Sequence, residues 1–419
     1  MSVLSDVLDL VFRRTMKGPV TPARESRSIP SLVEELLSSK GEISGLMTAQ
    51  RILDAYSEMN DAEKLDFFSY LADDLDIDHA RIEQALQSLK AKPDQRSYDV
   101  FLKAAEPRRQ ELARRLNRVP SATHQLVDMR ADLLRLLPSN DPRMRIDSDF
   151  RHLFASWFNR GFLVLRRISW ESPANVLEKI IRYEAVHAIS SWEDLRRRVA
   201  PEDRRCFAFF HPAMPDEPLI FVEVALTKGI ASSVQTLLSD ERTPLSAHQA
   251  DTAIFYSISN CQAGLAGISF GNSLIKQVVN DLAAELPDLA TFSTLSPIPL
   301  FSRWLAEQHL SPSQLTKPQL LAAAAHYLTS ARRDGGQHYD PVSRFHLGNG
   351  ALVHAVHADA DLSDRGQRES CGVMTNYLYD LASIEQNHES FANQKQVIAS
   401  PQVRTQAQSF QSIESLQDA

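Results

Sequence analysis

The stretch TAIFYSISNCQAGLAGISFGNSLIKQVVNDLAAELPDLATFSTLS, residues 252–296, contains the pattern that decides the fold of this chain. It begins with a β-rich apolar run at 252–259 and ends with another at 289–296. A glycine-containing loop and an amphipathic segment separate the two runs. The apolar residues that share one face of that segment are Leu274, Ile275, Val278, Val279 and Leu282. The stretch therefore predicts a strand, a glycine loop, a helix and a second strand, in that order.

The loop NCQAGLAGISFGN (260–272) places Gly264, Gly267 and Gly271 just before the predicted helix. Glycines allow backbone N–H groups to approach a ligand closely, and a helix N-terminus adds unpaired donors and partial positive charge. The spacing matches neither a P-loop nor the G-x-G-x-x-G dinucleotide motif. Glycines before a helix are also common turn residues, so a phosphate site and a simple turn both remain open.

Ser296 ends the second apolar run, and Pro297 and Pro299 follow it. One interpretation is that Ser296 caps the next helix, because Ser-Pro is a common N-cap and first helical residue. The other is that the prolines stop the strand and hold the hydroxyl over a pocket. The residues around Ser296 do not decide between them.

The first 150 residues consist of helical patterns separated by Pro, Gly, Asn and Asp; NDAEKLDFFSYLADDL (60–75), for example, opens with an Asn-Asp cap signal. They predict an all-α helical bundle domain at 1–150. Residues 151–419 alternate β-rich runs with helical segments, which predicts a mixed α/β domain and an α+β chain overall. From about residue 394 the sequence is polar and Gln/Ser-rich, typical of a frayed tail or a terminal helix lying on a neighbour. The other β-rich runs are 161–170, 206–210, 218–226 and 351–358.

Composition and charge exclude several classes of protein. The 419 residues carry a net charge of −8, which argues against a general nucleic-acid binder. No apolar run approaches the roughly 20 residues needed to span a bilayer, so we expect no membrane partner. The three cysteines are widely spaced, which argues against a disulfide framework and favours a reducing, cytoplasmic setting.

The segment HAVHADAD (354–361) contains residue types that bind metals. His354 and His357 are three residues apart, so on a strand their side chains project to opposite faces. That geometry is unsuited to a shared ion, and we expect no metal site here.

The strand, loop, helix and strand of 252–296 resemble the cofactor-binding core of the acetyltransferase-type (GNAT) fold. Residues from about 150 to 380 resemble the malonyl-CoA decarboxylase family more closely. The blocks that carry the resemblance occur in the same order as in the family, and they are FFHPAMPDEPLIFVEVALTKGI (209–230), AIFYSISNCQAGLAGISFGNSLIKQVV (253–279), FSTLSPIPLF (292–301), FHLGNGA (345–351) and SCGVMTNYLY (370–379).

The resemblance implies a catalytic pair, Ser296 and His346, with Tyr379 close to the site. It also implies that the glycine loop contacts the coenzyme A part of malonyl-CoA. The loop residues concerned are Ala266, Gly267, Ile268, Ser269, Phe270, Gly271 and Asn272. Some relatives carry a glutamate where this chain has Ser269, so a mechanism that needs a loop carboxylate is in doubt here.

The implied activity is conversion of malonyl-CoA to acetyl-CoA and CO2. The thioester is already an electron sink, so we expect neither a metal nor an organic cofactor. The family's helical domain implies self-association, as a homodimer or a homotetramer. Two other functions remain open: an acyl-CoA-dependent N-acyltransferase, which requires an amine co-substrate, and a non-catalytic acyl-CoA sensor, which tolerates loss of Ser296 and His346.

Overall fold

The computed structural model describes residues 27–38, 42–268, 274–333 and 335–417. The chain forms two compact units, Met1–Ala122 and Thr123–Ala419. The predicted division at residue 150 falls inside the second unit, because the helix before residue 150 and the helix that contains it both belong there. These are α8 (Ala122–Leu136), which starts at the junction, and α9 (Arg145–Trp157). The assignment of residues 1–150 to one helical bundle domain remains a prediction.

The described part of the first unit is helical. Its α4 begins after Asn60, whose side chain accepts hydrogen bonds from the N–H groups of Ala62 and Glu63. Glu63 returns a hydrogen bond to the N–H of Asn60 and completes a capping box, as the cap signal predicted. The helices are α2 (Ile29–Leu37), α3 (Glu42–Ser57), α4 (Asp61–Asp73), α5 (His79–Ala91), α6 (Gln95–Ala105) and α7 (Arg108–Leu116).

The second unit is built on a mixed sheet, which confirms the predicted α+β class. Its strands are ordered β1-β2-β3-β4-β5-β8-β6, and β7 pairs with β8. Their bounds are β1 (Val164–Ile168), β2 (Arg204–His211), β3 (Met214–Thr227), β4 (Thr252–Asn260), β5 (Thr291–Thr294), β6 (Ser296–Pro297), β7 (Leu352–His357) and β8 (Met374–Leu378).

The pair β4 and β5 is parallel, whereas the other pairings in the sheet are antiparallel. The pairing runs only from Thr252 and Thr291 to Phe255 and Thr294, after which β4 continues and the two strands separate. Helix α13 (Leu274–Glu285) connects them and buries the five predicted apolar residues. The arrangement matches the strand, helix and second strand expected from the sequence.

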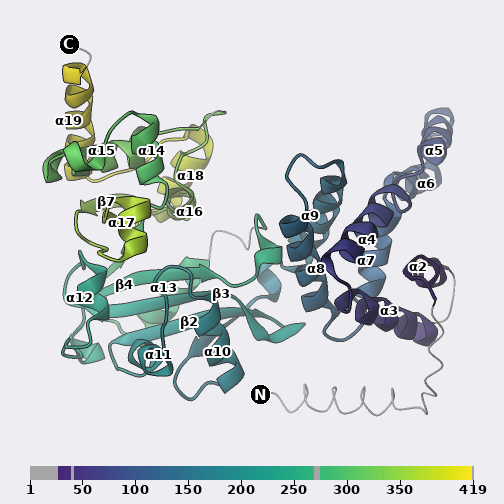
Figure 1. The fold of residues 1–419 in the computed structure, drawn as a ribbon, viewed down its shortest axis with the longest axis horizontal. Coiled ribbons are helices and arrows are strands. Elements are labelled where there is room, and N and C mark those ends of the chain that lie inside the picture. Colours follow the sequence, from purple (N-terminus) through teal and green to yellow (C-terminus); the bar gives the residue numbers. More distant parts are fainter. Residues whose placement is uncertain (1–26, 39–41, 269–273, 334, 418–419) are drawn as a thin grey trace. The chain divides into compact units, whose positions relative to one another are not determined.

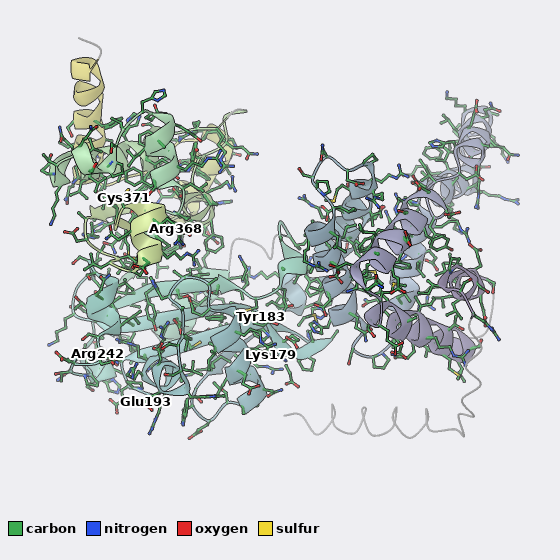
Figure 2. All side chains as sticks on the ribbon, in the orientation of Figure 1. Lys179, Tyr183, Glu193, Arg242, Arg368 and Cys371 are labelled. Atoms are coloured by element: carbon green, nitrogen blue, oxygen red, sulfur yellow. The ribbon has the colours of Figure 1, made fainter. Side chains whose placement is uncertain are left out.

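Helices α10 (Ala174–Tyr183) and α11 (Trp192–Val199) pack on β3 and β2 (Figure 1). Lys179 of α10 is also tied to β3, with its Nζ 2.6 Å from Glu217 Oε1 (Figure 2). Helix α10 begins one residue after Pro173, although Ser-Pro is a common pairing of N-cap and first helical residue. Pro173 is the N-cap, and the Ser172 hydroxyl instead accepts the N–H of Ser169.

Two features of the C-terminal part differ from a simple sequence interpretation. Strand β8, between β5 and β7, was not predicted as a strand. The polar C-terminal segment forms α19, which packs along α15 with Val403 and Phe410 buried. The remaining helices of this unit are α12 (Val234–Leu238), α14 (Phe301–Glu307), α15 (Lys317–Ser330), α16 (Pro341–Gly348), α17 (Asp364–Ser370), α18 (Ile384–Gln394) and α19 (Pro401–Gln417), with 3₁₀ turns at Pro142–Met144, Arg160–Phe162, Ala247–Gln249, Ala263–Leu265 and Pro312–Gln314.

Candidate functional site

Ser296 lies just past the point where β4 and β5 separate. It pairs with Thr375 of β8 in the two-residue strand β6, and its side chain is buried. Helix α14 begins only at Phe301, with Leu300 as its N-cap. The interpretation of Ser296 as a helix cap is therefore wrong, and the prolines hold an extended segment instead.

His346 reaches the same place from a different element, the last turn of α16. This short helix starts at Pro341 behind Asp340, whose side chain accepts the N–H of Ser343 at 2.8 Å. It ends at Gly348, and Gly350 follows with a φ of +85°. The cap and the glycine fix both ends of the helix that carries His346.

The structure brings the three predicted catalytic residues together as one chain of hydrogen-bonding groups. Ser296 Oγ lies 3.2 Å from His346 Nε2, and His346 Nδ1 lies 2.8 Å from the Tyr379 hydroxyl. These residues are 50 and 33 positions apart in sequence. A buried imidazole with a hydroxyl at each nitrogen can hold and transfer a proton.

Burial controls the charge of this group. It lowers the pKa of His346 to about 3, so the imidazole is neutral near pH 7. It also raises the pKa of the Tyr379 phenol well above its usual value, so that hydroxyl keeps its proton. The resting site is therefore an uncharged pair of hydroxyls and an imidazole.

Two further residues complete the surroundings of His346 and were not singled out from the sequence. Thr294 Oγ1 accepts the Ser296 hydroxyl at 2.9 Å, and the Tyr377 ring stacks on the imidazole with centroids 4.5 Å apart. Each lies two residues before a predicted site residue, at a spacing that puts both side chains on one face of a strand. That period of two was the signal available in the sequence.

The predicted coenzyme A loop is described only as far as Ile268. Ser269, Phe270, Gly271 and Asn272 lie outside the described residues. Ala266 is tied to α8, because Arg130 Nη1 donates to the carbonyls of Gly264 and Ala266 at 2.7 and 2.9 Å. Gly267 takes a φ of +72°, which favours glycine.

Gly264 serves packing within the protein rather than approach to a ligand. A Cβ at this position would lie 1.8 Å from the carbonyl oxygen of Val127 on α8. Arg130, which holds the loop, is itself paired with Asp147 of α9 at 2.7 Å and is almost fully buried. The two helices α8 and α9 therefore fix the start of the loop.

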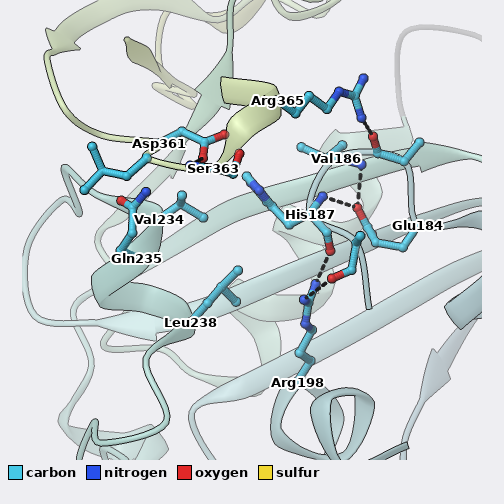
Figure 3. A pocket seen from close by; sticks show the side chains of 13 residues that line it. Glu184, Val186, His187, Arg198, Val234, Gln235, Leu238, Asp361, Ser363 and Arg365 are labelled. Atoms are coloured by element: carbon cyan, nitrogen blue, oxygen red, sulfur yellow. Dashed lines mark hydrogen bonds between the residues drawn. The ribbon is translucent and has the colours of Figure 1, made fainter. Parts of the chain in front are cut away.

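A separate cavity of about 800 Å³ opens between α11, α12 and the segment that leads into α17 (Figure 3). His187 projects into it beside Asp361, and burial lowers the pKa of this histidine to about 4. Glu184 accepts the N–H groups of Val186 and His187 at 2.7 and 2.8 Å and shapes this wall. The lining residues do not include Ser296, His346 or Tyr379.

Among the described residues, no cluster of three or more His, Cys, Asp or Glu side chains has an arrangement that holds a metal ion. His357 instead lies 2.5 Å from the Asn376 side-chain oxygen, and Asp359 pairs with Lys317. The helices in the described ranges also include none with the length and hydropathy of a membrane span.

The fold class is thus an α+β protein whose mixed sheet carries a buried Ser–His–Tyr chain of hydrogen-bonding groups. Comparison with protein families gives a narrower result. The malonyl-CoA decarboxylase C-terminal domain matches residues 161–317 and 311–417, and the malonyl-CoA decarboxylase N-terminal domain matches residues 75–158. The chain belongs to the malonyl-CoA decarboxylase family.

Individual relatives agree with this assignment. The chain is 34% identical to the mitochondrial malonyl-CoA decarboxylase of Anser anser anser, over 84% of this chain and 81% of that protein. Crystal structures of malonyl-CoA decarboxylase from Rhodopseudomonas palustris and Agrobacterium vitis are each 47% identical to it. They superpose with TM-scores of 0.86 and 0.85, over 90% of this chain and 98% and 99% of theirs.

Proposed function

We propose that this chain converts malonyl-CoA to acetyl-CoA and CO2 at the site formed by Ser296, His346 and Tyr379. The observation that carries the proposal is the buried chain of hydrogen-bonding groups from Ser296 through His346 to Tyr379, in a member of this family. The three side chains come from β6, α16 and the end of β8, and converge where the parallel strands separate.

The reaction places electrons on the α-carbon, and the thioester oxygen shares them as an enolate. Ser296 hydrogen-bonds the departing carboxylate or the thioester oxygen. It thereby holds the carboxylate out of the thioester plane, so that the breaking bond overlaps the carbonyl π-system. Fixed donors in a buried site stabilise the enolate because they need no reorganisation as charge develops. Neither a metal nor an organic cofactor takes part.

His346 protonates the α-carbon after CO2 departs. Malonyl-CoA loses CO2 and gains one proton to become acetyl-CoA, so solvent must supply one proton in each turnover. His346 gives a proton to carbon and receives its replacement, and Tyr379 keeps the ring oriented from the Nδ1 side. Burial lowers the pKa of His346 to about 3, so the imidazole is neutral before and after each turnover, and the proton from solvent restores its N–H group once it has protonated carbon.

The segment from Ala266 to Asn272 binds the diphosphate of coenzyme A. Support comes from its position before α13 and from the way Arg130 fixes its first residues. The chain acts as a homodimer or homotetramer in the cytoplasm, and these two features rest on the family resemblance and the cysteine pattern alone.

Replacing Ser296 with alanine tests the assignment of its hydroxyl. Loss of one hydrogen bond to a charged group costs about 1.5–3 kcal/mol, so kcat/KM for malonyl-CoA is expected to fall about 10- to 150-fold. Acetyl-CoA has no carboxylate, so its dissociation constant is expected to stay within about twofold if the hydroxyl binds the carboxylate, and to rise if it binds the thioester oxygen. Wild-type kcat/KM in Ser296→Ala would contradict a role for this residue.

A further inference from the structure

Thr294 is a buried threonine on β5 that the proposed reaction does not use. Its Oγ1 accepts two hydrogen bonds, from the Ser296 hydroxyl at 2.9 Å and from the Tyr377 N–H at 3.1 Å. Its carbonyl accepts the Asn376 side-chain N–H at 2.7 Å. These contacts hold the threonine in one place and make its Oγ1 an acceptor.

The acceptor role of Thr294 decides where the other protons lie. A serine has one hydroxyl proton, and that of Ser296 points to Thr294. The 3.2 Å contact between Ser296 and His346 therefore needs a proton from the imidazole, on Nε2. A neutral imidazole carries one N–H, so Nδ1 is bare and accepts the hydroxyl of Tyr379 at 2.8 Å.

We propose that Thr294 is a positioning residue that fixes His346 as its Nε2–H tautomer in the resting protein. It acts through Ser296, whose proton it accepts. Without this acceptor, the nearest partner for the Ser296 proton is Nε2, and the imidazole proton would move to Nδ1 and point at Tyr379. The ring itself would stay in place, because Tyr377 stacks on it at an interplanar angle of 22°.

The inference deepens the proposed function. The effect of the tautomer on catalysis rests on that function, whereas the tautomer itself does not. If His346 protonates the α-carbon, the transferable proton is already on the nitrogen that faces Ser296 before substrate arrives. The hydrogen bonds that define the tautomer do not involve substrate. The tautomer can therefore be measured in the free protein, separately from turnover.

The experiment is ¹⁵N NMR at pH 7 on full-length protein labelled in its histidine rings, with the His346 signals assigned by difference against His346→Gln. The expected wild-type result is a protonated Nε2 and an unprotonated Nδ1. Thr294→Val, which replaces the hydroxyl with a methyl, is expected to reverse the pattern. Thr294→Ser keeps the oxygen and is expected to keep the wild-type pattern. A protonated Nδ1 in the wild type, or an unchanged tautomer in Thr294→Val, overturns the proposal.

Thr294→Val also leaves the Tyr377 N–H without an acceptor, at a cost of about 1–3 kcal/mol. If it does not fold, Thr294→Ala removes the same oxygen with a smaller side chain. The same NMR measurement is then made on that variant, with the same expected reversal of the tautomer. In kinetics, the folded variant is expected to lose at least about tenfold in kcat with KM within about twofold, and Thr294→Ser to recover most of it. If Thr294→Val reverses the tautomer but the wild-type protein does not turn over malonyl-CoA, the inference about Thr294 stands and only the proposed function is overturned.

Discussion

Replacing His346 with glutamine is expected to lower kcat/KM for malonyl-CoA by about 10²- to 10⁴-fold, the usual contribution of a positioned general acid. Glutamine can fill the space and form hydrogen bonds toward Ser296 and Tyr379, but it cannot deliver a proton to carbon. The measurement is steady-state release of acetyl-CoA, together with the dissociation constant for acetyl-CoA. That constant is expected to stay within a few-fold, because the imidazole acts on the α-carbon rather than on the coenzyme A portion.

His338→Gln is the matched control. His338 is also a buried histidine, burial lowers its pKa to about 4, and its Nε2 lies 2.7 Å from the Leu328 carbonyl. It has no hydrogen bond to Ser296 or Tyr379 among those of the described residues, so its variant is expected to keep near wild-type kcat. Equal losses in the two variants, or turnover by His346→Gln within tenfold of wild type, would contradict the role of His346.

Replacing Gly350 with alanine is expected to reduce the free energy of unfolding by about 3–5 kcal/mol. Gly350 has a φ of +85°, and a Cβ there would lie 2.0 Å from the carbonyl oxygen of Ile384. Because that atom belongs to the backbone, α16 or α18 must shift to relieve the collision. The N–H of the following residue, Ala351, bonds to the carbonyl of His346, so the shift is also expected to reduce activity in whatever protein remains folded.

Gly335→Ala is the control that separates backbone strain at positive φ from a collision of the added Cβ with a neighbouring atom. Gly335 has the same φ of +85°, but nothing lies within 4 Å of a Cβ placed there. Its variant pays only the left-handed backbone cost, about 1–2 kcal/mol. Urea-induced unfolding of both variants gives the comparison. If the free energy of unfolding falls equally in both variants, the close approach to Ile384 does not contribute to stability. The account of how His346 is fixed would then be wrong.

Much of the second unit could be predicted from local sequence. The runs at 206–210 and 252–259 became strands because they are short, apolar and bounded by turn residues. Helix α13 followed from apolar residues at helical spacing, and all five predicted positions are buried. These are local signals, in which the residues that determine an element are also the residues that form it.

Long-range contacts could not be predicted in this way. The sequence left a phosphate site and a simple turn both open for the loop glycines, whereas Gly264 packs on Val127, and the Arg130 that binds its carbonyl is 134 residues away. Strand β8 was missed because MTNYL has polar residues among its buried positions. Those polar groups are satisfied by neighbours that only the fold supplies, as when Asn376 donates to the carbonyl of Thr294.

The site itself was predicted from the family resemblance rather than from spacing. Nothing local relates Ser296 to His346, and the interpretation of Ser296 as a helix cap was reasonable until β6 was seen to pair with β8. Thr294 and Tyr377 were overlooked because the family resemblance implied roles only for Ser296, His346 and Tyr379. Their positions two residues before Ser296 and Tyr379 acquire meaning only when both strands are known to face the same imidazole.

The most direct test of the central claim is incubation of purified protein with malonyl-CoA alone, in the presence of EDTA, with acetyl-CoA and CO2 followed together. The account predicts equal amounts of both products without any added co-substrate. Binding of malonyl-CoA without release of CO2, or consumption only when an amine acceptor is supplied, would contradict decarboxylation at the site of Ser296 and His346.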